Sequence, residues 1–308
     1  MKDKITLNKE NCKILICCHK PCELPPNLDG LFLPIQVGAA ISDADLGMQR
    51  DDQVNGEPCD NISAKNKSYC ELTALYWAWK NIKKLYPNLE YIGLNHYRRY
   101  FSFDKKNCFD YVINCPETEI KNYKVNKNKL KKILYKNEIV LSKNVIGPYS
   151  LEVNYSTAHF SEDIKTVKKI VHEKYPEYDS TVYNIFTYGF RFSPANMMIM
   201  KWCDFCAYAK WLFGILEIAE KNIDIKNYNP IQKRVFGYLA ERLFNVWINH
   251  NIKKIKFLNI LMFCSDKRKS KIKIFLSYIK ANLIEKISGL GKKSYSQKFY
   301  NEINGFEK

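Results

Sequence analysis

The fold is decided by the stretch Tyr91-Ile92-Gly93-Leu94-Asn95-His96-Tyr97-Arg98-Arg99-Tyr100-Phe101. Its first four residues form a short apolar run, which predicts a strand buried on both faces, as in a parallel sheet. The basic residues stand where this strand ends. Ligands of open α/β sheets bind outside the carboxyl ends of the strands. The stretch therefore predicts an α/β fold with a cationic site at one edge of its sheet.

The segments around this stretch alternate between strand and helix patterns. An apolar run at residues 13–18 predicts a buried first strand, with the loop His19-Lys20-Pro21 at its end. Residues 68–82 carry apolar side chains at helical spacing behind a capping box of Ser68 and Glu71. Further strands are expected at residues 31–38, 138–141 and 196–200, and further helices after Ser161, through residues 211–220 and after Pro230. Residues 121–137 are rich in Lys and Asn and predict a solvated excursion.

Length and composition bound the class of protein. The 308 residues fit one large domain, or one domain with an appendage. The sequence has no run of about 18 apolar residues and its start lacks a secretory signal, so we expect a cytoplasmic protein. Eleven cysteines, an odd number scattered along the chain, predict free thiols. The net charge of +17 points to nucleic acid, anionic lipid or nucleotide phosphates as partners.

The charge is concentrated near the carboxyl end. Residues 267–293 hold nine Lys or Arg and one acid, Glu285. Apolar residues recur among these lysines at helical spacing, which is typical of an interfacial helix on anionic lipid. A terminal helix packed on the core with a basic outer face is the alternative. We therefore expect a main domain at residues 1–260 and a basic amphipathic tail at residues 261–308. No nucleic-acid-binding motif accompanies the charge, so nucleic acid is not a predicted partner.

Three further groups of residues could carry chemistry. Two adjacent arginines, Arg98 and Arg99, can offer forked donors to phosphate oxygens, and His96 can donate a hydrogen bond or move a proton. A structural ion-pair cluster is the alternative for them. Glu241 shares a helix face with Arg234 and could act as a general base, or form a solvated ion pair. His159 precedes a predicted helix as a ligand contact or a simple loop residue.

A metal site is a separate question. Asp43-Ala44-Asp45 matches the Asp-x-Asp pattern that holds a divalent metal on a nucleotide diphosphate, but it comes early in the chain. No metal ligand is therefore assigned to the site, and Asp43 and Asp45 are the residues that would hold a metal ion.

These residues together resemble a family of bacterial capsular-polysaccharide and lipopolysaccharide glycosyltransferases long catalogued as a domain of unknown function. The resemblance covers roughly residues 13–247, and the His-Tyr-Arg-Arg-Tyr block is its most specific part. The other matching segments are Asp60-Asn61-Ile62-Ser63 with Lys65-Asn66, Tyr69-Cys70-Glu71-Leu72-Thr73-Ala74-Leu75-Tyr76-Trp77, Asn196-Met197, Trp211-Leu212-Phe213 and Arg234-Val235-Phe236-Gly237-Tyr238-Leu239-Ala240-Glu241-Arg242-Leu243.

The resemblance implies a GT-A-like mixed sheet flanked by helices, with a helical C-terminal extension. It implies transfer of a hexosyl unit, galactosyl or galactofuranosyl, from a UDP-sugar to a lipid-linked or polysaccharide acceptor of capsule or O-antigen assembly. The enzyme would work at the inner face of the cytoplasmic membrane. A non-catalytic sugar-nucleotide-binding or scaffold protein of the same machinery is the alternative.

The same resemblance assigns site residues. Catalysis falls to Glu241, His96, Arg98 and Arg99, and contact with donor or acceptor to His159 and Asn196. Donor binding falls to His19, Lys20, Asp60, Asn61, Ser63, Asn66, Tyr97 and Arg234. Where the wider GT-A pattern places Asp-x-Asp after the central strand, this chain has Asn95-His96-Tyr97. That departure leaves manganese or magnesium open as a cofactor, and Arg98 and Arg99 could neutralise the diphosphate instead.

Overall fold

The structure is a computed structural model that describes residues 7–264 and 271–290. The chain divides into two compact units. The first combines residues 1–143, 195–210 and 253–268, and the second combines residues 144–194, 211–252 and 269–308. The helix α7 (Trp202–Asn222) contributes residues to both units.

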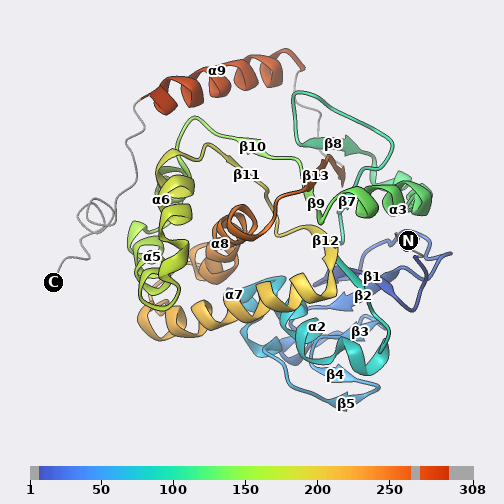
Figure 1. The fold of residues 1–308 in the computed structure, drawn as a ribbon. Coiled ribbons are helices and arrows are strands. Elements are labelled where there is room, and N and C mark those ends of the chain that lie inside the picture. The colour runs from blue at the N-terminus through green and yellow to red at the C-terminus, as the bar shows by residue number, and fades with distance from the viewer. Residues whose placement is uncertain (1–6, 265–270, 291–308) are drawn as a thin grey trace, which may run out of the picture. The chain divides into compact units, whose positions relative to one another are not determined.

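A mixed sheet organises the first unit (Figure 1). Its central strand β1 (Cys12–Cys18) pairs in parallel with β2 (Phe32–Gln36) and with β6 (Tyr91–His96). The strands follow the order β13-β9-β12-β6-β1-β2-β3, and off this path β7 pairs with β6, β14 with β7, and β8 with β14. The remaining strands are β3 (Gln49–Arg50), β7 (Arg99–Phe101), β8 (Val112–Cys115), β9 (Ile139–Ser142), β12 (Met198–Lys201), β13 (Ile255–Leu258) and β14 (Ile260–Phe263). The predicted α/β class with a mixed, helix-flanked sheet is confirmed.

The strand order reverses between β1 and β6. From β1 the chain moves outward to β2 and then β3, and it returns through α2 (Leu72–Leu85) to β6 on the other side of β1. Beyond β1 the chain therefore continues on one side of this reversal, and beyond β6 it continues on the other. Open α/β sheets bind ligands at such a reversal. The residues that follow β1 and β6 are those the sequence singled out.

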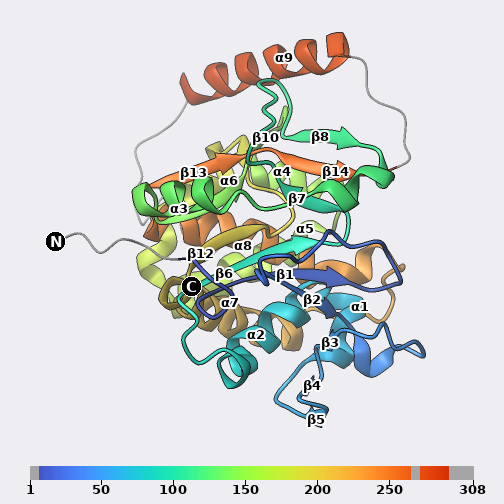
Figure 2. The same ribbon diagram turned by 90° about the vertical axis from the view of Figure 1, so that its right-hand side faces the viewer.

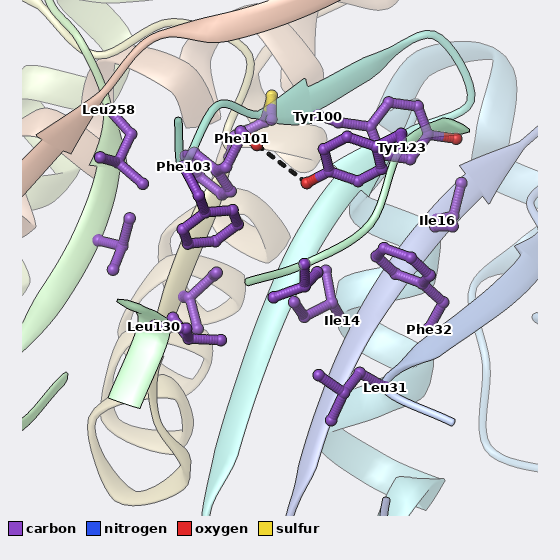
Figure 3. Close-up of a cluster of buried hydrophobic side chains, with 14 of the residues drawn as sticks. Ile14, Ile16, Leu31, Phe32, Tyr100, Phe101, Phe103, Tyr123, Leu130 and Leu258 are labelled. Carbon is purple, nitrogen blue, oxygen red and sulfur yellow. Dashed lines mark hydrogen bonds between the residues drawn. The ribbon is translucent and has the colours of Figure 1, made fainter. Parts of the chain in front are cut away.

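Apolar side chains fill one face of this sheet (Figure 3). Ile14 and Phe32 pack there with Tyr100, and the hydroxyl of Tyr123 donates to the carbonyl oxygen of Phe101 at 2.9 Å. The helix α3 (Lys127–Lys136) covers this face, while α2 lies on the opposite side of β1 and β6 (Figure 2). The expected solvated excursion at residues 121–137 is thus wrong for most of its length, because α3 buries Leu130 and Leu134 in the cluster.

Gly93 lies at the centre of the sheet and leaves no room for a side chain. A Cβ there would stand 2.9 Å from Cγ1 of Ile199 and 3.0 Å from the carbonyl oxygen of Met198. We expect Gly93→Ala to lower the free energy of unfolding by about 1–3 kcal/mol, as overpacked core variants do. Urea denaturation measures this, with Gly147→Ala as control, since its Cβ would meet nothing closer than 3.7 Å. Equal stability of both variants would contradict the packing described.

Helices form most of the second unit. They are α4 (Leu151–Ser156), α5 (Ser161–Lys174), α6 (Asp179–Tyr188), the later part of α7, α8 (Val235–Asn251) and α9 (Lys271–Leu290). A short pair of strands, β10 (Val145–Ile146) and β11 (Arg191–Phe192), joins them. Ser193 follows β11, and its backbone N–H donates to Oδ1 of Asn245 on α8 at 2.8 Å. No helix in residues 7–264 and 271–290 is long and apolar enough to cross a membrane.

Several predicted boundaries are shifted. The helix after Pro230 begins only at Val235, and β14 continues the sheet to Phe263. The polar segment before α2 contains α1 (Asn66–Tyr69) and the strand pair β4 (Gln53–Val54) and β5 (Glu57–Pro58). The capping box is wrong, because α2 begins with Glu71 at the N-cap position instead of Ser68. All eleven cysteines are free thiols, as expected.

Candidate functional site

Backbone hydrogen bonds tie together the loops at the carboxyl ends of the central strands. The N–H of Tyr97, directly after β6, donates to the carbonyl oxygen of Cys17 on β1 at 3.1 Å. The N–H of Val37, directly after β2, donates to Cys18 at 2.9 Å. The chain after β1 therefore leaves the sheet beside the chain after β6. This brings the predicted His19-Lys20 loop to the His-Tyr-Arg-Arg segment.

Three side chains surround the ring of Tyr97. The imidazole of His19 lies edge to face with it, with centroids 5.1 Å apart. The Nζ of Lys20 lies 5.6 Å from the Tyr97 centroid, and the guanidinium carbon of Arg98 lies 5.1 Å from it. Such distances are within the range of cation–π attraction. We call His19, Lys20, Tyr97 and Arg98 the cationic cluster.

Lys20 and Arg98 of the cationic cluster have no carboxylate partner among the described residues. Both side chains are exposed, so their charges repel each other only weakly through water. An oxyanion between them would replace this repulsion with charge-assisted hydrogen bonds. The arrangement is therefore chemically suited to a phosphate or diphosphate group.

His96 and Arg99 occupy different surroundings from Arg98. His96 pairs with Arg99 where β6 turns into β7, and Arg99 also pairs with Met262 on β14. The Nε2 of His96 donates to the carbonyl oxygen of Ala195 at 2.7 Å, which fixes the proton on that nitrogen. His96 thus joins the end of β6 to the turn that leads into β12. Its predicted catalytic role stays a prediction.

The turn before β12 has an unusual backbone. Ala195 and Asn196 have φ values of 70° and 51°, in the left-handed region that non-glycine residues rarely enter. The side chain of Asn196 is 2% exposed, and its Nδ2 donates to Oε1 of Glu71 at 2.8 Å. Its Oδ1 is buried and has no hydrogen-bond partner. Asn196 was predicted from the sequence as a site residue, whereas Glu71 was predicted to cap a helix and was given no role in the site.

The polar loop at residues 60–66 uses most of its side chains internally. The hydroxyl of Ser63 donates to the buried carboxylate of Asp51, which also accepts from the N–H groups of Gly38 and Ala39 at 2.8 and 3.0 Å. The Nδ2 of Asn66 donates to the carbonyl oxygen of Cys70 at 2.8 Å. These bonds shape the loop beside the end of β2. A donor-binding role for Ser63 and Asn66 stays a prediction.

The start of the same loop is more open. The Oδ1 of Asn61 accepts from the N–H of Ser63 at 3.0 Å, which closes a local turn. The carboxylate of Asp60 is 57% exposed and accepts from the hydroxyl of Tyr76 at 3.1 Å. Asp60 is thus the accessible acidic side chain among the predicted donor-binding residues of this loop.

A second group of predicted residues meets in the second unit. The ring of His159 stacks on Tyr238 with centroids 4.1 Å apart, and the guanidinium of Arg234 lies 5.3 Å from the same tyrosine ring. The carboxylate of Glu241 forms an ion pair with Arg242, whose guanidinium lies 5.6 Å from the ring of Tyr155. The ring centroids of Tyr155 and His159 lie 4.8 Å apart. His159, Arg234 and Glu241 thus belong to one aromatic and charged cluster.

Burial shifts the titration of this second cluster. It lowers the pKa of His159, although the hydrogen bond between Nδ1 and Oε1 of Gln232 at 3.0 Å acts in the opposite sense. It raises the pKa of Asp163, despite a 2.7 Å hydrogen bond from the hydroxyl of Tyr228. The lowered pKa favours the neutral form of His159, in which Nδ1 donates to Gln232 and Nε2 is an acceptor.

Comparison with known proteins places these residues in a family. The family model described as "Domain of unknown function (DUF4422)" matches residues 13–252. The chain belongs to this family. A search of the curated proteins finds no match. The apo structure of the WbbM bifunctional glycosyltransferase matches with a TM-score of 0.72 and 32% identity, over 83% of this chain and 46% of that chain. The DUF4422 chain thus spans just under half the length of that protein.

The match confirms the family and the GT-A-like fold expected from the sequence. The matched residues 13–252 run from β1 to the end of α8, so they include the cationic cluster and the aromatic and charged cluster around His159. The basic helix α9 lies beyond the matched range. The two clusters are therefore features of the family region, and α9 is an addition to it.

The acidic pair of this DUF4422 chain does not form a ready metal site. Asp43 and Asp45 lie in the exposed loop before β3, and Oδ1 of Asp45 accepts from the N–H of Gly47 at 2.9 Å. Among the described residues, no three His, Cys, Asp or Glu side chains gather as metal ligands. A nucleotide diphosphate would have to supply most of the ligands to any ion there. A role of Asp43 and Asp45 as metal ligands stays a prediction.

Proposed function

We propose that this chain is a glycosyltransferase that moves a hexosyl unit from a UDP-sugar to a surface-polysaccharide acceptor. The observation that supports this most is the cationic cluster, which stands where the strand order reverses between β1 and β6. That position is where open α/β sheets bind nucleotides. The likeness to the WbbM bifunctional glycosyltransferase supports the same reaction class.

In the proposed reaction the bond between the sugar C1 and the β-phosphate oxygen breaks, and UDP leaves with the bonding electrons. Lys20 and Arg98 neutralise the charge that develops on the diphosphate, and Arg99 stays a predicted contributor to that charge. The acceptor hydroxyl oxygen bonds to C1 and its proton passes to a carboxylate. Glu241 stays the predicted group for that step. Galactose or galactofuranose is the proposed sugar, from the resemblance stated above.

We further propose that the acceptor is lipid-linked or part of a growing capsule or O-antigen chain. The enzyme would then work on the inner face of the cytoplasmic membrane as a peripheral protein. Support comes from α9, which presents Leu276, Ile279, Leu283 and Ile287 as exposed apolar side chains. Exposed lysines, Lys280 and Lys286, stand on the same helix. This combination suits an anionic lipid surface.

A screen of UDP and UDP-hexoses tests the proposed function. A ligand at 100 times its Kd should raise the melting temperature of the full chain by about 5 °C. We expect one UDP-hexose to exceed UDP in this shift, and the same compound to release UDP when sugar acceptors are added. Parallel arms with EDTA, manganese or magnesium measure the metal dependence. Binding without UDP release in any arm would favour a non-catalytic binding protein, and no shift with any compound would contradict the proposal.

A further inference from the structure

Glu71 is an acidic residue at the sheet edge that the proposed reaction does not yet use. It stands directly before α2, and its Oε1 accepts from Asn196 at 2.8 Å. In the part of the chain that the structure describes, no Lys or Arg forms an ion pair with it. Burial raises the pKa of the Cys17 thiol, and the negative charge of Glu71 adds to that rise. Asn196 follows Ala195, whose carbonyl oxygen accepts from His96 at the end of β6, so Glu71 lies near the carboxyl end of that strand.

The backbone on both sides of the Glu71–Asn196 contact is strained. Cys70, which precedes Glu71, has a φ of 53°, and Ala195 and Asn196 have φ values of 70° and 51°. Non-glycine residues keep such conformations only where the surrounding structure holds them, and they gather at ligand sites. The strain is concentrated on the two segments that carry this hydrogen bond. In this conformation the Nδ2 of Asn196 points to Oε1 of Glu71.

Asn196 has a hydrogen-bonding capacity that the protein leaves unused. Its Oδ1 is buried without a partner, although its Nδ2 is bonded to Glu71. A buried acceptor without a donor is costly, and native structures rarely keep one. A hydrogen-bond donor therefore belongs beside Asn196. Hydroxyl groups supply such donors, and a carboxylate is the acceptor that binds them most strongly.

We propose that Glu71 accepts hydrogen bonds from hydroxyl groups of the donor hexose, with Asn196 as its positioning residue. The inference rests on the proposed function, because it assigns Glu71 to the sugar half of the same nucleotide sugar. A carboxylate fixed in direction distinguishes epimers by which hydroxyl reaches it. Glu71 thus determines which hexose is bound, and the cationic cluster binds the diphosphate whatever the sugar.

Titration calorimetry with two isosteric variants tests this division of roles. The ligands are UDP, UDP-galactose, UDP-galactofuranose and UDP-glucose. We expect Glu71→Gln to bind UDP within about 2-fold of the unmodified protein and to lose at least about 10-fold in affinity for the preferred UDP-hexose, as expected for a hydrogen bond to a charged group. Glu90→Gln is the matched control. Glu90 is exposed and stands at the opposite end of β6, so its change should alter neither affinity.

The positioning role of Asn196 needs its own variant. Asn196→Gly removes the side chain and keeps the left-handed backbone without strain. We expect this variant to bind UDP normally and to lose most of the preference for one UDP-hexose over its epimers. A purely structural role would leave that preference intact. Melting temperatures of both variants check that they are folded.

The outcomes separate this inference from the proposed function. Unchanged UDP-hexose affinity and epimer preference in Glu71→Gln would overturn the role of Glu71 and leave the transferase proposal standing. Equal losses for UDP and UDP-hexose would also overturn it, since Glu71 would then not act on the sugar. If the unmodified protein binds neither UDP nor any UDP-hexose, the proposed function is contradicted, and the role of Glu71 with it.

Discussion

Replacing Lys20 and Arg98 together by alanine is expected to lower the affinity for UDP by at least about 100-fold. Each charged hydrogen-bond donor contributes about 1.5–3 kcal/mol, and 1.4 kcal/mol corresponds to a factor of ten. Both side chains lie around Tyr97 without a carboxylate partner among the described residues, so their removal breaks no ion pair within the protein. Titration calorimetry in EDTA measures the loss without a contribution from divalent metal.

A control variant must show whether the loss of a positive charge by itself lowers the affinity for UDP. Lys106→Ala removes one exposed positive charge in the loop between β7 and β8, away from the cationic cluster in sequence. We expect its UDP affinity to stay within about 2-fold, because the effect of one exposed charge outside the cationic cluster is weakened by water and salt. Single Lys20→Ala and Arg98→Ala variants should each show roughly the square root of the double effect. A double variant that binds UDP as the unmodified protein does would contradict the diphosphate site.

The second large effect is expected at the membrane. The helix α9 is held by Arg191, whose Nε donates to Glu285 at 2.9 and 2.8 Å and whose Nη2 donates to Asn282 at 2.6 Å. Ala281 is buried on this side of the helix. Leu276, Ile279, Leu283 and Ile287 remain exposed, at 48–60% of their surface. Within the tail expected at residues 261–308, α9 thus contacts Arg191 through Glu285 and Asn282 and leaves these apolar side chains exposed, whereas residues 265–270 and 291–308 lie outside the described residues.

Leu283→Asp with Ile287→Asp is expected to abolish binding to vesicles that contain anionic lipid. Burial of one Leu or Ile contributes about 1.5–3 kcal/mol, so the double change should reduce binding by at least about 100-fold. Vesicle co-sedimentation measures it. Leu28→Asp is the control, because Leu28 is 88% exposed but lies in the first unit. Equal sedimentation of the double variant and the unmodified protein would contradict membrane binding by α9.

The parts of the fold that the sequence predicted share a physical cause. The strands β1 and β6 are buried on both faces, so their sequences are continuous apolar runs that stand out. Lys20 and Arg98 lie around one tyrosine ring because the parallel strands β1 and β6 present their carboxyl ends at one edge of the sheet. The prediction of the two strands needed no knowledge of distant contacts.

The wrong predictions concern segments whose local sequence pattern fits two different structures. The segment at residues 121–137 is rich in lysine, yet Asn126 caps α3 and Leu130 and Leu134 stand four residues apart on its buried side. That four-residue spacing was the sequence feature that indicated a helix. Glu71 was predicted to belong to a capping box. The start of α2 depends on the left-handed backbone of Cys70, and the sequence does not indicate that backbone because Cys70 is not a glycine.

The loop at residues 60–66 illustrates a further limit of sequence reasoning. Its polar side chains resemble ligand-binding groups, but a loop that folds back on itself must satisfy its own backbone donors and acceptors. Ser63 and Asn66 do this through Asp51 and Cys70. Asp51 itself was not predicted, because a buried carboxylate that accepts backbone N–H groups looks in the sequence like any turn aspartate.

A structure of the full chain with bound UDP, grown in EDTA, tests the central claim most directly. We predict the β-phosphate at the carboxyl ends of β1 and β6, with its oxygens within about 3 Å of the Lys20 and Arg98 side-chain nitrogens. A diphosphate bound away from Tyr97, or bound only when a divalent metal joins it to Asp43 and Asp45, would contradict the claim.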